Sequence, residues 1–159
     1  MAIDNQFLGS DLISHPSFNP PDEGSKKRRQ VAALPVKRTL EGELCVLLVT
    51  SRETRRWIIP KGNPIKGLAD HEAAATEARE EAGVVGRIQA EAIGSYQYRK
   101  TASDDSDPVR VVVYLVAVEG ALEKFKEKGQ REIRWFSVSD AADLVQELEL
   151  RSIIKTLTP

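Results

Sequence analysis

The residues whose type and spacing best suit chemistry are three glutamates, Glu77, Glu80 and Glu81. On an α-helix, positions i, i+3 and i+4 share one face, so the three carboxylates would lie within side-chain reach of each other. Like charges this close repel, and the dipole at the end of a helix disfavours anions. A bound cation removes both penalties, and oxygen ligands suit a hard ion such as Mg²⁺ or Mn²⁺. The spacing by itself equally allows a solvated acidic face on a surface helix.

The helix that must carry these glutamates is predicted over residues 70–82. Asp70 is a favourable N-cap residue, and Gly83 suits the left-handed conformation in which many helices end. The segment between them is rich in alanine, which has the highest helix propensity. The metal hypothesis therefore depends on one short helix that holds the carboxylates in its last turn.

The segment around this helix resembles the signature of the Nudix hydrolase family, G-x5-E-x7-R-E-U-x-E-E-x-G-U, where U is a bulky apolar residue. The spacing agrees without a gap, and Ala78 occupies an apolar position. The resemblance implies a hydrolase of phosphate anhydrides that uses Mg²⁺ or Mn²⁺, with the three glutamates in catalysis. It also implies that the metal is held by Glu77, Glu80, Glu81 and Gly62. The matching residues are Gly62, Glu77, Glu80, Glu81, Gly83 and Val84.

Two positions depart from that signature. Leu68 stands where the family has its first glutamate, and Thr76 stands where the family has an arginine that pairs with a catalytic glutamate. Arg79 lies three residues farther along and points in another direction on a helix. The metal-binding carboxylates are all present, whereas the pair that normally orients one of them is absent.

The likeness extends over residues 30 to about 157 and is greatest to the diphosphoinositol polyphosphate phosphohydrolase branch, whose members also cleave diadenosine polyphosphates. It is carried by residues 46–52, 56–62 and 134–136, with Lys61 in place of a glycine common in the animal members. The resemblance implies a small polyphosphorylated substrate, either a diadenosine polyphosphate or an inositol pyrophosphate. A housecleaning nucleotide or ADP-ribose pyrophosphatase is the alternative with the same chemistry. A nucleotide-sensing module with a weakened site is the alternative of another class, suggested by Leu68 and Thr76.

Basic residues cluster just before the motif and at the ends of two predicted strands, and three more, Lys126, Lys128 and Arg131, precede the last strand. Arginine binds phosphate oxygens in bidentate fashion and lysine adds a point charge, so such a set beside acidic metal ligands suits a polyphosphate. Each of them taken singly is explained as well by surface solubility. Tyr96 and Tyr98 share one strand face and could stack on a nucleobase, although core or rim positions are commoner for tyrosines. The residues expected to bind substrate are Arg52, Arg55, Arg56, Lys61, Arg99 and Arg110.

The bulk composition excludes several classes of protein. A chain of 159 residues with a formal net charge of −1 suits one domain and gives no reason to expect a nucleic-acid duplex as partner. Cys45 is the only cysteine, so an internal disulfide is impossible, and its apolar neighbours favour a small buried hydrophobe. No apolar run approaches the ~18 residues that cross a bilayer, and the first residues lack a signal-peptide pattern. We therefore expect a cytoplasmic protein without a membrane partner, as a monomer or homodimer.

The pattern of elements predicts an α+β fold, the Nudix-type α/β/α sandwich in which a mixed β-sheet lies between helices. Residues 1–29 are expected to be an N-terminal arm or disordered tail that ends in a solvated basic linker at 26–29, and residues 30–159 the hydrolase domain. A second helix is expected to begin near Ser139 or Asp140. The expected strands are 31–36, 44–50, 57–59, 88–98, 109–118 and 133–138, with a hairpin turn at 41–43 and helices at 70–82 and 139–157.

Overall fold

The computed structural model describes residues 28–99 and 108–157. Most of the expected N-terminal arm lies outside these residues. In chain order the elements are β1 (Arg29–Arg38), β2 (Leu44–Thr50), β3 (Trp57–Ile58), β4 (Lys61–Gly62), α1 (Asp70–Ala82), β5 (Val84–Ile88), β6 (Gly94–Tyr98), β7 (Val109–Ala121), β8 (Ile133–Ser137), α2 (Val138–Leu144) and α3 (Leu148–Lys155).

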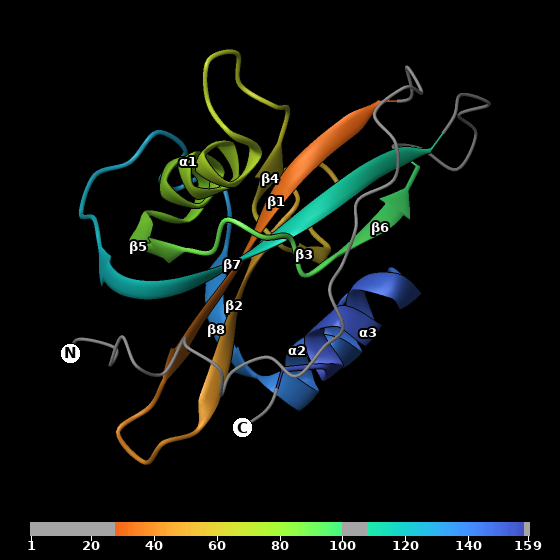
Figure 1. Ribbon diagram of the computed structural model, residues 1–159. Helices are drawn as coiled ribbons and strands as arrows, with labels where there is room; N and C mark the ends of the chain where they lie inside the picture. Colours follow the sequence, from red (N-terminus) through yellow and green to blue (C-terminus); the bar gives the residue numbers. More distant parts are fainter. Residues whose placement is uncertain (1–27, 100–107, 158–159) are drawn as a thin grey trace.

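The strands form one mixed eight-stranded sheet whose central pair is β1 and β7 (Figure 1). These two strands run parallel, with Arg29 beside Arg110 at one end. The remaining pairs are antiparallel: β2 and β4 pair with β1, β5 and β6 with β7, and β3 and β8 with β2. Because β4 pairs with the first part of β1, Gly62 lies opposite Val31 near the start of the sheet.

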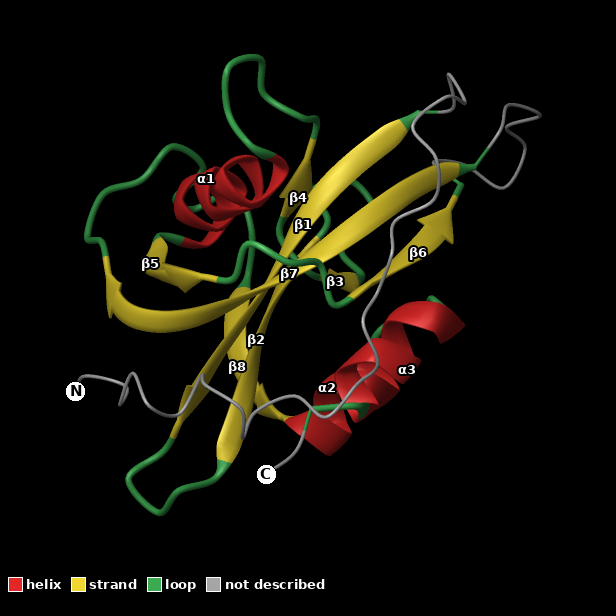
Figure 2. Ribbon diagram, in the orientation of Figure 1, coloured by secondary structure: helices red, strands yellow, loops and turns green. Residues whose placement is uncertain are grey.

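Helices cover both faces of this sheet, α1 on one and α2 with α3 on the other (Figure 2). Successive side chains of a strand point to opposite faces, which separates two hydrophobic cores. In β1, Val31 and Ala33 belong to the core under α1, whereas Ala32 and Leu34 belong to the core under α2 and α3. The expected α+β class and α/β/α arrangement with a mixed sheet are confirmed.

The strand expected over 88–98 is in fact two strands. Residues 89–93 stand opposite only Tyr114 and Leu115 of β7, so the ladder between β5 and β6 is interrupted there. The N–H of Gln89 donates to Leu115 O at 3.0 Å and the N–H of Ile93 to Val113 O at 2.9 Å, which ties both ends of the bulged segment to β7. The apolar pattern continues through this segment and therefore conceals the break.

The single helix expected over 139–157 is also divided, into α2 and α3. Val145 has an extended backbone (φ −78°, ψ 145°) that ends α2. The Arg151 side chain donates to Ala142 O at 3.0 Å and Val145 O at 3.2 Å, and so satisfies carbonyls that α2 leaves unpaired. The N-cap of α2 is Ser137, whose hydroxyl accepts from the Asp140 N–H at 3.1 Å, and not Ser139 or Asp140.

The hairpin expected at 41–43 is confirmed and joins β1 to β2. Gly42 adopts φ 87°, a left-handed conformation that costs glycine little, and its N–H donates to Thr39 O at 2.9 Å. Cys45 on β2 is only half-buried, so the expectation of a buried residue is wrong. Partial burial is still the main cause that raises the pKa of its thiol, which argues against a reactive thiolate.

The end of the basic run at 26–29 belongs to the sheet and is not a free linker. Arg29 is the first residue of β1, and its guanidinium forms an ion pair with Asp70 at the start of α1. Within the two described ranges, no helix is long and apolar enough to cross a bilayer.

Candidate metal centre

The side of α1 that faces the sheet consists of small residues. Small side chains allow a helix to approach the strands closely, and here they bring Glu77 of α1 against β4. The helix ends as predicted at Gly83 (φ 67°), but it begins after Ala69, whose N–H donates to the Glu72 carboxylate at 3.0 Å. Asp70 is therefore the first helical residue and not the predicted N-cap. The buried alanines are Ala73, Ala74, Ala78 and Ala82.

Gly62 and Glu77 are in direct contact. A Cβ atom added to Gly62 would lie 2.3 Å from the carboxyl carbon of Glu77, so the carboxylate would have to move away. The absence of a side chain at this position therefore creates the space that the Glu77 carboxylate fills. The contact joins β4 to α1 and explains in steric terms why the first residue of the motif is glycine.

Glu77 and Glu81 form a coupled pair of carboxyl groups one helical turn apart. Glu81 is 2% exposed, and burial, followed by a hydrogen bond with Glu77, raises its pKa from the ordinary value of 4.5 to about 9. Burial is also the main cause that raises the pKa of Glu77, although its hydrogen bond with Glu81 opposes that shift. Two ionised carboxylates cannot both persist here without a compensating cation.

A buried arginine approaches this pair from the loop before β8. Nη2 of Arg131 lies 3.6 Å from Oε1 of Glu81 and 3.1 Å from Oε1 of Glu127, and its side chain is 9% exposed. Nη1 of Arg131 donates to Thr50 O at 3.1 Å, which ties the loop to the end of β2. At 3.6 Å the contact with Glu81 is an ion pair without a hydrogen bond, and Oε1 of Glu81 has no hydrogen-bond partner among the described residues.

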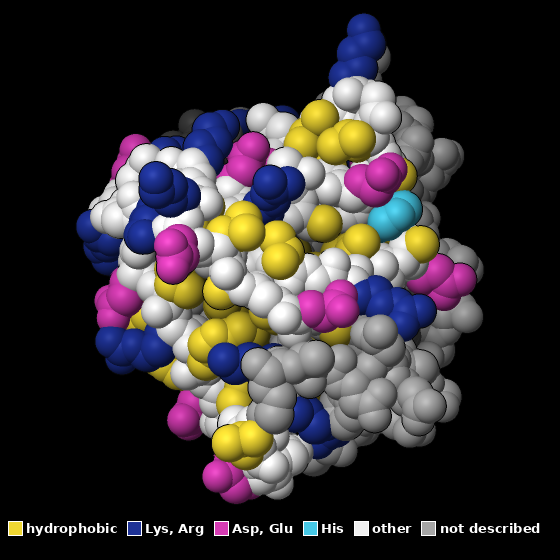
Figure 3. Space-filling model, turned by 90° about the vertical axis from the view of Figure 1, so that its left-hand side faces the viewer, with side chains coloured by type: hydrophobic (Ala, Val, Ile, Leu, Met, Phe, Trp, Pro, Cys, Tyr) yellow, Lys and Arg dark blue, Asp and Glu magenta, His cyan; other side chains and the backbone are white. Residues whose placement is uncertain are grey.

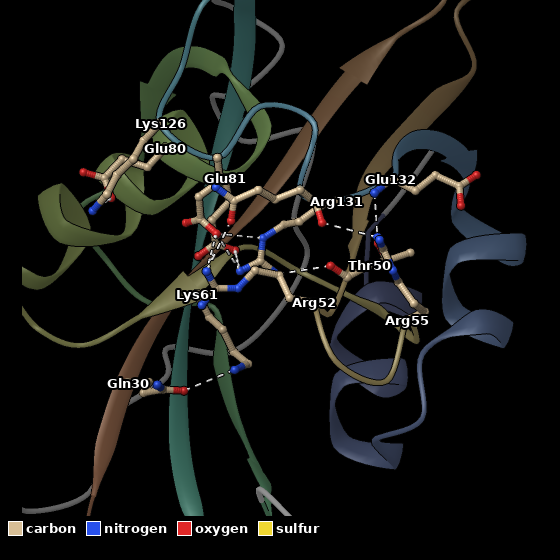
Figure 4. A network of polar contacts seen from close by, with 12 residues as sticks. Gln30, Thr50, Arg52, Arg55, Lys61, Glu80, Glu81, Lys126, Arg131 and Glu132 are labelled. Carbon is tan, nitrogen blue, oxygen red and sulfur yellow. Dashed lines mark hydrogen bonds and ion pairs between the residues drawn. The ribbon is translucent and has the colours of Figure 1, made fainter.

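The Glu80 side chain is turned toward Lys126. Its carboxylate lies 3.6 Å from Nζ of Lys126, and the two side chains stand apart from Glu81, Arg131 and Arg52 (Figure 4). The structure therefore brings together two of the three glutamates that the helical spacing placed on one face.

The surface beyond Glu80 is a shallow hollow between α1 and the loop that follows β7. Figure 3 shows the face at the left of Figure 1, where basic and acidic side chains alternate and no patch of one sign dominates. The hollow has a volume of about 350 Å³ and is lined by Thr76, Arg79, Glu80, Leu122, Lys124, Phe125 and Lys126.

The first three cations expected to bind substrate lie in the loop between β2 and β3 and do not act as one group. Nη1 of Arg52 lies 3.6 Å from Glu127, close to the buried Arg131. Arg55, with φ 55°, donates to Gln130 O at 3.3 Å and so fastens two loops together. Arg56 instead forms an ion pair of 2.6 Å with Glu147 at the start of α3.

The other three expected cations lie at the start of the sheet. Lys61 is on the face covered by α2 and α3, where Nζ donates to Tyr98 Oη at 3.0 Å and lies 4.3 Å from the centre of the Tyr98 ring. Arg110 on β7 pairs with Gln97 of β6, and the exposed Arg99 follows the end of β6. Tyr96 is 1% exposed and therefore a core residue, as expected of the commoner case. These six cations do not form the single cradle that the sequence indicated.

The two departures from the family signature leave no arginine–glutamate pair on α1. Leu68 is 40% exposed, and the Thr76 hydroxyl donates to Glu72 O within the helix at 2.9 Å. The arginine nearest to the buried carboxylates is Arg131, which reaches them from another element.

Arg131 and Glu127 complete this site; the sequence indicated Arg131 only as one of the cations before the last strand, and it did not indicate Glu127. They are four residues apart in a loop, and the only signal that could have found them is the clustering of charges from Lys124 to Glu132. The Glu127 carboxylate is a further cause that raises the pKa of both Glu77 and Glu81, so it acts on the same place electrostatically.

The donors assembled here fit a divalent cation with oxygen ligands. Oε1 of Glu81 is buried without a hydrogen-bond partner among the described residues, and burial raises the pKa of both carboxyls although Arg131 opposes the shift at Glu81 and Lys126 that at Glu77. A divalent ion would satisfy that oxygen and favour the ionised forms. Among residues 28–99 and 108–157, no three acidic, histidine or cysteine side chains already converge as a metal cage, since Glu80 is turned to Lys126.

Comparison with known proteins agrees with this geometry. The model of the NUDIX domain matches residues 26–157. Human diphosphoinositol polyphosphate phosphohydrolase 3-alpha is 33% identical over 127 residues, which cover 78% of this chain and 71% of that protein. Nudix hydrolase 13 of Arabidopsis thaliana, a mitochondrial protein by name, is 29% identical over 121 residues, 72% of this chain and 60% of that one. The chain spans only 52–60% of the length of four such Arabidopsis relatives.

Solved structures show the same fold. The Ap4A hydrolase of C. elegans superposes with a TM-score of 0.58 at 18% identity, over 82% of this chain and 95% of that one. The NUDIX domain of Shewanella oneidensis NrtR, solved with ADP ribose, gives a TM-score of 0.62 at 14% identity, over 96% and 95%. Gly62 of the signature contacts Glu77 of the signature, and the family model matches residues 26–157 of this chain. The chain therefore belongs to the NUDIX domain family.

Proposed function

We propose that this protein is a metal-dependent hydrolase of phosphate anhydride bonds in polyphosphorylated or nucleoside-diphosphate-linked substrates. The observation that carries the proposal is the pair of the half-buried Glu77 and the buried Glu81: Oε1 of Glu81 has no hydrogen-bond partner among the described residues, and burial raises both pKa values. Carboxylates in this state are suited to a divalent cation, and the family relationship makes phosphate anhydrides the expected substrates.

The residues of this chain have distinct parts in the proposed reaction. Glu77 and Glu81 would hold Mg²⁺ or Mn²⁺ beside Gly62, and Glu80 would join them by leaving Lys126. The bound metal would polarise a phosphorus–oxygen bond and lower the pKa of the attacking water. Glu80 or Glu81 would orient that water or take its proton. Arg131 would keep the Glu81 carboxylate in place through their ion pair.

The substrate class rests on the cations around the site and on the relatives. Arg52 lies beside Glu127 of the metal centre and Lys61 directly precedes Gly62, whereas Arg56 is paired with Glu147. Diphosphoinositol polyphosphate phosphohydrolase 3-alpha and the Ap4A hydrolase are named for inositol pyrophosphates and a diadenosine polyphosphate, and we propose these classes for this chain. The location in the cytoplasm and the monomeric or homodimeric state stay predictions.

A substrate panel tests this function. The full chain is incubated with diadenosine polyphosphates, an inositol pyrophosphate and ADP-ribose, with Mg²⁺, with Mn²⁺ or with a chelator, and phosphorylated products are quantified. We expect metal-dependent release from the first two classes. Glu77→Gln and Glu81→Gln should each lower turnover by at least about 100-fold while the protein stays folded. Wild-type turnover in either variant would contradict the proposal, and preference for ADP-ribose would favour a housecleaning pyrophosphatase.

The exposed Leu68 and the internally bonded Thr76 support a second candidate, a nucleotide-sensing module with a weakened site. In the family signature these positions orient a catalytic glutamate, and here they do not. Nucleotide binding without product release from any member of the panel would support this candidate and reject the hydrolase.

A further inference from the structure

The shallow hollow beside Glu80 lies between α1 and the loop that follows β7. Thr76, Arg79 and Glu80 form its first wall, because positions i, i+3 and i+4 share one face of a helix. Its volume of about 350 Å³ falls within the range of ~300–1,000 Å³ that small-molecule sites occupy. The hollow is therefore large enough for a small ligand. The second wall consists of the loop residues Leu122, Lys124, Phe125 and Lys126.

The loop wall is fixed to the end of α1 by contacts along its length. The N–H of Leu122 donates to Gly83 O at 2.6 Å, and the N–H of Glu127 donates to Glu80 O at 2.9 Å. Between these two bonds the Phe125 ring packs on Gly83, where a Cβ atom would lie 2.4 Å from the ring. These contacts hold both walls together, so the hollow has its shape before any ligand binds.

The charges around the hollow are three cations and one carboxylate. Lys126 lies 3.6 Å from the Glu80 carboxylate. Within the described part of the chain, Arg79 and Lys124 have neither an ion pair nor a side-chain hydrogen bond. Arg79 stands in the last turn of α1, where a cation also favours the helix dipole. Two cations with unused donors beside a preformed hollow are suited to an anion.

The floor of the hollow adds an apolar contribution to this site. Leu122 and Phe125 are only partly buried, and both line the hollow. An aromatic side chain offers a large surface to a ring, and its stacking is favourable in addition to the area that is buried. The combination of cations with an apolar floor therefore favours an anion that carries a ring over a bare inorganic ion.

Lys126 connects this hollow to the candidate metal centre. Its side chain is 70% exposed and its contact with Glu80 is too long for a hydrogen bond, so the ion pair is weak and readily exchanged. If Glu80 turns to a metal, the Lys126 ammonium is released and the negative charge of Glu80 is neutralised. Both changes strengthen the binding of an anion in the hollow. By linkage, the anion then strengthens metal binding by the same factor.

We propose that the hollow binds a phosphate monoester that carries a ring, as a second ligand, and that its occupancy is coupled to the metal centre through Lys126 and Glu80. Arg79 and Lys124 would pair with the phosphate, and the two apolar loop residues would contact the ring. The coupling rests on the proposed function, in which Glu80 joins the metal, whereas the phosphate site does not depend on it.

The test measures binding of adenosine monophosphate to the full chain by isothermal titration calorimetry, in the presence of a chelator. Adenosine lacks the phosphate and inorganic phosphate lacks the ring, so each should bind at least about tenfold more weakly. Arg79→Met and Lys124→Met each remove one cation and should weaken binding of the nucleotide by about three- to tenfold. Lys155→Met is the matched control, because Lys155 is an exposed lysine of α3 on the other face of the sheet, and it should bind like the wild type.

Glu80→Gln tests the coupling without any metal, because it releases Lys126 and removes the negative charge from the hollow. It should strengthen binding of adenosine monophosphate by about two- to fivefold. When Lys126→Met is already present, the same substitution should strengthen binding less, and the difference measures the interaction of the two residues.

The phosphate site would be overturned if the wild type does not bind the nucleotide, if either fragment binds as tightly, or if Arg79→Met and Lys124→Met bind it like Lys155→Met. An equal effect of Glu80→Gln with and without Lys126 would overturn the coupling. Since these measurements need neither metal nor turnover, their result is independent of whether the substrate panel detects hydrolysis.

Discussion

The metal-free protein should lose stability as the pH rises, because of one carboxyl group. Burial first, and the hydrogen bond with Glu77 second, raise the pKa of Glu81 from 4.5 to about 9. Between these two values the folded state retains a proton that the unfolded state has released. Stability therefore falls with increasing pH over this window, by about 1.4 kcal/mol per pH unit for one such group. Between pH 6 and pH 8 the expected loss is about 3 kcal/mol.

Glu81→Gln removes this titration, because a glutamine amide has the shape of the carboxyl group and stays neutral. The free energy of unfolding, measured by urea titration with a chelator at pH 6, 7 and 8, should decline less steeply in the variant, by about 3 kcal/mol over the range. Glu91→Gln removes the same charge from an exposed position and is the matched control. Parallel pH profiles for wild type and Glu81→Gln would refute the claim that burial holds the pKa of this carboxyl far above its ordinary value.

Three further predictions follow from steric and electrostatic contacts in the structure. Gly62→Ala places a Cβ atom 2.3 Å from the Glu77 carboxyl carbon, and should lower kcat by at least about tenfold in a product-release assay as the carboxylate is displaced. Arg131→Met removes a cation that pairs with the half-buried Glu127 and donates to Thr50 O, and should lower the free energy of unfolding by about 1–3 kcal/mol at pH 7 in a urea titration. Gly83→Ala should destabilise more than Gly67→Ala in the same titration: both residues have positive φ, but only at Gly83 would a Cβ meet another side chain, at 2.4 Å.

The helix with the glutamates was predictable because its signals are local. Alanine propensity and a C-terminal glycine define residues 70–82 in the sequence, and the structure places α1 there. The sandwich followed from the alternation of strands and helices. The divisions within 88–98 and 139–157 were not predictable, since the apolar pattern runs through both breaks. They are set by tertiary hydrogen bonds, such as those of Arg151 to the end of α2.

The candidate site was predictable only in part, because spacing along a helix does not determine where a long side chain turns. Glu77 and Glu81 meet, whereas Glu80 turns to Lys126, a residue of a loop far away in sequence. The cations were expected to bind substrate as one set, but tertiary contacts separate them. Arg56, for example, forms an ion pair with Glu147. The position of Lys61 required the strand register, which places it on the face opposite Glu77.

The central claim is that the Glu77–Glu81 pair of α1 holds a divalent metal. Titration of the full chain with Mn²⁺, followed by the decrease of the free-ion electron paramagnetic resonance signal, tests it without any assumption about substrate. The account predicts that the wild type takes up Mn²⁺, that Glu77→Gln and Glu81→Gln bind it at least about tenfold more weakly, and that Glu91→Gln binds it like the wild type. Uptake of Mn²⁺ by both pair variants with the affinity of the wild type would contradict the account.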